Sequence, residues 1–95
     1  MTKEEWLKLA KENHNELKEK FKEALEETKN KNKAFTVVLG DNGSCYIVEN
    51  YRPNNAGLDF ITFENAEELK QFENDVDFWF ELFFETFIER IELTL

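Results

Sequence analysis

The sequence has few of the residues that build disulfides and metal sites. It contains one cysteine and one histidine in 95 residues. A single cysteine excludes an intrachain disulfide, and one cysteine with one histidine cannot supply an ordinary structural zinc site. We therefore expect a fold that has no cofactor and no bound metal.

Long hydrophobic runs are also missing. The sequence has no stretch of about twenty apolar residues, which is the length that a membrane-spanning helix needs. Near the N-terminus, no apolar run is long enough for a secretory signal. These absences predict a cytoplasmic protein with no membrane partner.

Basic residues are scarce, with 12 Lys and Arg against 21 Asp and Glu and a formal net charge of −9. Nucleic acids and anionic membranes are both negatively charged and attract Lys and Arg, so an excess of acids argues against either as a direct partner. Apolar residues, by contrast, make up 41% of the chain and include ten phenylalanines. Such a content excludes a disordered chain. At this length it predicts one domain, residues 1–95, with one modest core.

Apolar periodicity predicts a helix over residues 2–31, in which Thr2 and Glu5 have the spacing of a capping box. A second helical region begins at Asn65, which can act as its cap. It continues as one long helix or as two helices broken near Asn74 and Asp75. Residues 91–95 alternate apolar and polar side chains, so they could form a fourth strand instead of a frayed helix end.

The middle of the chain predicts β-structure. Residues 35–39 and 45–51 are rich in β-branched and aromatic side chains, and the Asn42-Gly43 pair between them is a strong hairpin signal. Residues 52–57 break regular structure, and residues 58–63 read as a third strand. The sequence thus predicts an α+β fold with a three-stranded antiparallel meander. We expect its inner face to pack on the aromatic side of the C-terminal helix, with the N-terminal helix over part of that helix or over a sheet edge.

Charge is divided unequally along the chain. Residues 1–33 carry nine bases and eight acids, whereas residues 34–95 carry three bases and thirteen acids. At about 100° per residue, the acids of the C-terminal helix fall on one arc opposite the main apolar group. These acids are Asp77, Glu81, Glu85, Glu89 and Glu92, with Glu73 and Asp75 at the margin. Each like-charged pair four residues apart costs a helix about 0.2–0.5 kcal/mol, and a basic partner would convert this repulsion into binding energy.

Apolar residues border the acidic arc. Phe78 and Leu82 lie at its edge and Ile88 lies inside it, where a helix resting on a sheet would not need them. They could be anchors in a charged interface. They could also pack under the N-terminal helix or form a homodimer contact. A merely solvated acidic face is the alternative to a binding face.

Signals for catalysis are weak. A catalytic dyad would need Cys45, which lies in a predicted strand, to come close to His14, which lies on a predicted helix. A buried thiol and an ordinary helix histidine account for the two residues without catalysis. The loop at residues 40–44 lacks the ending of a phosphate-binding loop, and no calcium-loop spacing occurs. We therefore predict that the protein is not an enzyme.

In its acidic helix and its order of elements, the chain resembles small phage-encoded anti-CRISPR proteins that imitate DNA. Some members of that group combine a helix, a three-stranded antiparallel sheet and acidic helices at about this length. The resemblance covers the whole chain in architecture and composition, without a diagnostic motif. It implies that the acidic arc occupies a Lys- and Arg-lined DNA-recognition pocket of an RNA-guided nuclease. It also implies that the protein acts in the cytoplasm of a bacterial host cell.

The leading hypothesis is an inhibitor protein, monomeric or homodimeric. It would bind a basic nucleic-acid-binding or catalytic surface of a CRISPR-associated nuclease, with a Cas9-type enzyme as first choice, and block it stoichiometrically. One alternative is an immunity or antitoxin protein that neutralises a toxic nuclease. Another is a homodimeric structural or adaptor module.

Overall fold

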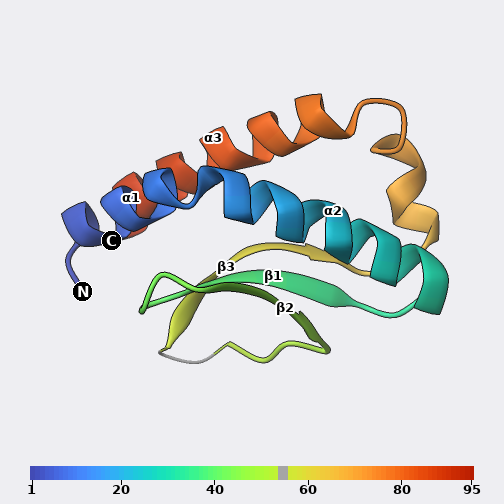
Figure 1. Cartoon of the computed structure of the whole chain (residues 1–95), viewed down its shortest axis with the longest axis horizontal. Helices are drawn as coiled ribbons and strands as arrows, with labels where there is room; N and C mark the ends of the chain where they lie inside the picture. The colour runs from blue at the N-terminus through green and yellow to red at the C-terminus, as the bar shows by residue number, and fades with distance from the viewer. Residues whose placement is uncertain (54–55) are drawn as a thin grey trace.

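The structure is a computed structural model that describes residues 1–53 and 56–95. It confirms the α+β class, with N-terminal helices, a three-stranded antiparallel sheet and a C-terminal helix (Figure 1). The elements are α1 (Lys3–Glu12), α2 (His14–Lys31), β1 (Phe35–Gly40), β2 (Cys45–Glu49), β3 (Gly57–Phe63), the 3₁₀ helix η1 (Glu67–Gln71) and α3 (Val76–Thr94). Of the predicted break at residues 52–57, residues 54–55 lie outside the described part of the chain.

The sheet has the order β2-β1-β3, so the predicted meander is wrong. The hairpin itself is confirmed, because β1 and β2 pair antiparallel with Leu39 opposite Cys45. Gly43 in its turn has a φ of +86°, which a residue without a Cβ adopts readily. The chain then passes to the far edge of β1 (Figure 1), where β3 also pairs antiparallel with it. All residues of β1 are buried, so the most apolar strand takes the central position, where both of its edges are hydrogen-bonded.

The predicted single helix over residues 2–31 is also wrong, because it bends at Asn13 between α1 and α2. The side-chain Nδ2 of Asn13 donates to the carbonyl oxygen of Leu9 at 2.8 Å. A straight helix of that length would measure about 45 Å, whereas the longest extent of the molecule is 36 Å. The bend carries α1 onto α3, where Trp6 and Ala10 are buried.

The remaining expectations concern the start of α1 and the C-terminal helical region. The capping box is confirmed, with the backbone N–H of Glu5 donating to Thr2 Oγ1 at 3.1 Å. A break near Asn74 and Asp75 is present, and α3 begins after Asp75, whose side chain accepts from the backbone N–H of Phe78 at 3.2 Å. α3 continues to Thr94, so a strand at residues 91–95 is excluded. The burial of Ile91 in the core explains why the helical conformation persists there.

The helices form a layer on the inner face of the sheet (Figure 1). α2 contacts all three strands, whereas α3 packs on α1, α2 and β3. The expectation that the sheet packs mainly on the aromatic side of α3 is therefore wrong, since α2 takes that place.

Phe21 of α2 is fully buried at the centre of the core. Its ring lies 5.3–6.4 Å from the rings of four phenylalanines of β3 and α3, namely Phe60, Phe63, Phe80 and Phe83. In the described residues, no helix combines the length and the apolar character needed to cross a membrane.

Candidate protein-binding surface

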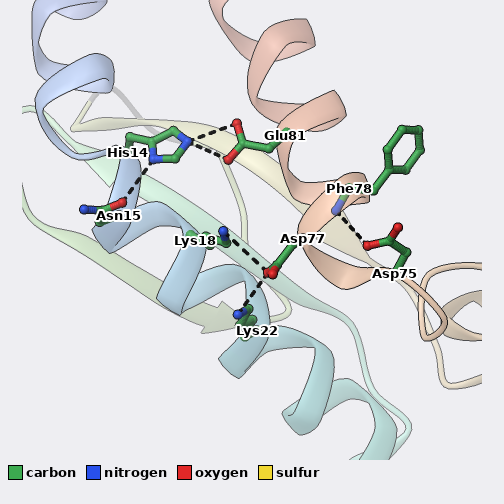
Figure 2. A network of polar contacts seen from close by, with 8 residues as sticks. All are labelled: His14, Asn15, Lys18, Lys22, Asp75, Asp77, Phe78 and Glu81. Carbon is green, nitrogen blue, oxygen red and sulfur yellow. Dashed lines mark hydrogen bonds and ion pairs between the residues drawn. The ribbon is translucent and has the colours of Figure 1, made fainter.

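The sides of α3 have different surroundings. Phe80, Phe87 and Ile91 are buried in the core. Asp77 and Glu81 turn toward α2 (Figure 2). The side that points away from both is exposed to solvent, and we define the outer face of α3 by its exposed residues Phe78, Leu82, Glu85, Glu89, Glu92 and Leu93.

Lysines of α2 neutralise the first acids of the predicted arc. Asp77 lies 3.1 Å from Lys22 Nζ and 3.5 Å from Lys18 Nζ (Figure 2). The hydrogen bond from Lys22, followed by the charge of Lys18, lowers the pKa of the Asp77 carboxyl. Glu73, which precedes α3, lies 3.7 Å from Lys29 Nζ. The sequence predicts repulsion along the whole arc, and for these two acids that prediction is wrong, because lysines of a different helix offset the repulsion.

Glu81 is tied to His14, the first residue of α2. Nε2 of His14 lies 2.8 Å from one carboxylate oxygen and 3.1 Å from the other (Figure 2). The imidazole also packs in a T-shaped arrangement with the Phe80 and Phe84 rings, at centroid distances of 5.2 and 4.7 Å. Glu81 therefore connects α3 to α2 and is also a partly exposed acid of the surface.

The later acids have no such partners. Glu85, Glu89 and Glu92 are exposed, and none of them forms an ion pair with any residue in the described ranges. Arg90 is the single base in the sequence of α3. Its guanidinium donates to the carbonyl oxygen of Asp59 and lies 5.2 Å from the Phe87 ring. The free carboxylates therefore form a shorter row than the sequence predicts, at the C-terminal half of α3.

Apolar side chains flank this shorter row. Phe78 and Leu82 are 56% and 41% exposed, as expected for residues at the border of the arc. Ile88 is half-buried against the core and has a structural role. Leu93 is 80% exposed and was not singled out from the sequence. Its helical angle near that of Leu82 is the signal that would have identified it.

The two residues considered for a catalytic dyad have different surroundings. Cys45 is buried in β2, and burial, with a smaller effect of Glu16, raises the pKa of its thiol to about 11. His14 interacts with Glu81 and Asn15. Across the residues that the structure covers, no three His, Cys, Asp or Glu side chains gather closely enough to hold a metal ion.

Together, the fold and the surface define a small α+β protein whose candidate site is one exposed side of a helix. No protein-family model matches the chain, and it matches no curated protein and no solved structure.

Proposed function

We propose that the protein is an inhibitor that binds a basic nucleic-acid-binding or catalytic surface of a nuclease and blocks it stoichiometrically. A CRISPR-associated nuclease of the Cas9 type is the first candidate. The observation that carries the proposal is the exposed row of Glu85, Glu89 and Glu92, which form no ion pair within the described residues. The same chain supplies Lys18, Lys22 and Lys29 to acids that face α2.

The geometry of the row suits a groove that normally holds nucleic acid. Side chains four residues apart on a helix are displaced by about 6 Å along its axis. Lysines and arginines that follow a phosphate backbone can therefore meet successive carboxylates. The attraction would speed association and would weaken as salt increases. Inhibition would follow from occupancy, without turnover.

A DNA-cleavage assay with a purified Cas9-type nuclease and its guide RNA tests this proposal. We expect cleavage to fall in proportion to the added protein and to recover at high salt. The variant Glu85→Lys with Glu89→Lys should abolish inhibition. It leaves the contacts of Asp77 and Glu81 with α2 in place.

The matched control is Glu19→Lys with Glu64→Lys, which changes the net charge equally at exposed positions outside α3. This control should still inhibit. Equal loss in both variants would mean that net charge, rather than the outer face of α3, governs inhibition. Affinity capture of nucleases from a lysate, washed first at low and then at high salt, extends the search if the first enzyme is not inhibited. Absence of inhibition for every captured nuclease would contradict the proposed function.

A further inference from the structure

The outer face of α3 has the spacing of a coiled-coil seam. Phe78, Leu82, Glu85, Glu89 and Glu92 follow one another at steps of four, three, four and three residues. At about 100° per residue, these positions lie within an arc of about 80°. All of them are exposed. This alternating spacing is the one by which a second helix packs along the length of a first.

We propose that the outer face of α3 binds a basic amphipathic helix of the partner protein, packed side by side with α3. The inference rests on the proposed function for the basic character of the partner, and it adds that a helix carries the partner's basic surface. From Phe78 to Glu92 the seam is about 21 Å long, which is about four helical turns.

The composition of the seam determines what the partner helix must present. Apolar side chains such as Leu or Ile would pack on Phe78 and Leu82, which are the two apolar seam positions. Lys or Arg would face Glu85, Glu89 and Glu92. Charged residues along such seams select the partner by complementarity.

The same composition disfavours a second copy of this chain as the occupant. Packed in parallel, two outer faces would bring the carboxylates of Glu85, Glu89 and Glu92 of both copies together. Like charges at this separation repel, and burial would remove the water that screens them. Packed antiparallel, they would bury Glu89 and Glu92 of each copy against the apolar end of the other, where a carboxylate has no partner. Charge complementarity therefore favours a basic partner over self-association.

Core packing fixes α3 in the orientation that presents the seam to a partner. Phe80, Phe87 and Ile91 fix the opposite side of the helix in the core. Next to the seam lies a hollow of about 370 Å³, lined by Thr86, Glu89, Arg90, Leu93 and Thr94. A rigid helix loses little conformational freedom on binding.

Synthetic helical peptides test the inference independently of any nuclease. The probe has Leu at two successive seam positions and Lys at the next three, and it is made in this order and in the reverse order to allow either helix direction. A scrambled peptide of the same composition spreads Leu and Lys around the helix. By titration calorimetry at physiological salt, we expect one of the ordered peptides to bind at least about tenfold more tightly than the scrambled peptide.

Variants of the protein sharpen the test. Glu85→Lys with Glu89→Lys should lose the preference for the ordered peptide, and a peptide with Glu at the matching positions should restore it. Phe78→Ala with Leu82→Ala should also lose the preference, whereas Glu19→Lys with Glu64→Lys should keep it. Equal binding of ordered and scrambled peptides would overturn the inference. Sedimentation that shows a dimer disrupted by Phe78→Ala with Leu82→Ala would also overturn it in favour of a second copy.

The outcomes separate this inference from the proposed function. Nuclease inhibition without discrimination between the peptides would leave the function in place and remove the helix partner. Discrimination between the peptides without inhibition of any nuclease would support the helix partner and contradict the proposed function.

Discussion

His14 and Glu81 lie 67 positions apart in the sequence, and their side chains meet at 2.8 Å. This contact joins the first residue of α2 to the N-terminal half of α3 (Figure 2). Together with the pairing of Asp77 with Lys18 and Lys22, it uses the acids of the N-terminal half of α3 to hold two helices together. From Glu85 onward, the acids of α3 have no such role within the described residues.

Glu81→Gln and Glu85→Gln should therefore have opposite effects on stability. Glu81→Gln weakens the contact with His14 and also removes the repulsion from Glu85, so it should lower the free energy of unfolding by less than about 1 kcal/mol, because both His14 and Glu81 are partly exposed. Glu85→Gln removes repulsion from Glu81 and Glu89 and should raise it by about 0.5 kcal/mol. Urea unfolding at neutral pH and low salt measures both changes. A loss of stability in Glu85→Gln would indicate a structural role for that carboxylate.

Asp77 should contribute to the acid sensitivity of the fold. Lys22 and then Lys18 lower the pKa of its carboxyl below the usual 3.8. The folded state therefore releases this proton at lower pH than the unfolded state does. The resulting stability is present above about pH 4 and is lost as the pH falls through the lower, folded-state pKa.

Asp77→Asn should consequently be less stable than the wild type at pH 7, and this difference should shrink near pH 2. Urea unfolding at both pH values provides the comparison. Asp41→Asn removes an exposed carboxylate from the hairpin turn and is the control for loss of one negative charge. A difference for Asp77→Asn that stays constant with pH would contradict the role of the Lys22 and Lys18 contacts.

Thr28 of α2 is fully buried, and its hydroxyl oxygen has no hydrogen-bond partner among the described residues. An unsatisfied buried polar group costs about 1–3 kcal/mol. Thr28→Val keeps the shape of the side chain and removes the hydroxyl, so it should raise the free energy of unfolding by about 1 kcal/mol. Thr28→Ser keeps the hydroxyl, removes the methyl group and should destabilise the protein. Urea unfolding that shows Thr28→Val to be the less stable protein would mean that the hydroxyl does have a partner.

The thiol of Cys45 should be unreactive in the folded protein. Burial raises its pKa from 9.0 to about 11, and the thiolate is the reactive form. Iodoacetamide at about pH 8 should therefore modify the native protein far more slowly than the urea-unfolded protein. Because the folded state holds this proton more tightly, stability should fall as the pH rises from about 9 to about 11. Equal rates of alkylation in the two states would contradict the burial of this thiol.

The features that the sequence predicts correctly depend on nearby residues. The capping box of Thr2 and Glu5 and the hairpin turn at Asn42 and Gly43 involve partners within a few positions, so residue types and spacing are sufficient. The break before α3 is of the same kind, because Asp75 caps the helix through Phe78.

The incorrect predictions concern choices between distant segments. The local pattern of residues 2–31 is helical throughout, and the bend at Asn13 reflects the burial of Trp6 and Ala10 against α3. Short connections favour a meander, but the complete burial of β1 places that strand at the centre of the sheet. Both outcomes depend on how distant segments pack against one another, which the order of elements along the chain does not specify.

The sequence by itself determined that the acids of α3 lie within one arc of the helix, because the turn of a helical backbone fixes the direction of each side chain. Only the tertiary structure decided which of these acids are free. Lys18, Lys22 and His14 reach Asp77 and Glu81 because α2 packs beside the N-terminal half of α3. The α2 bases do not reach Glu85, Glu89 and Glu92, and neither helix's own periodicity contains this information.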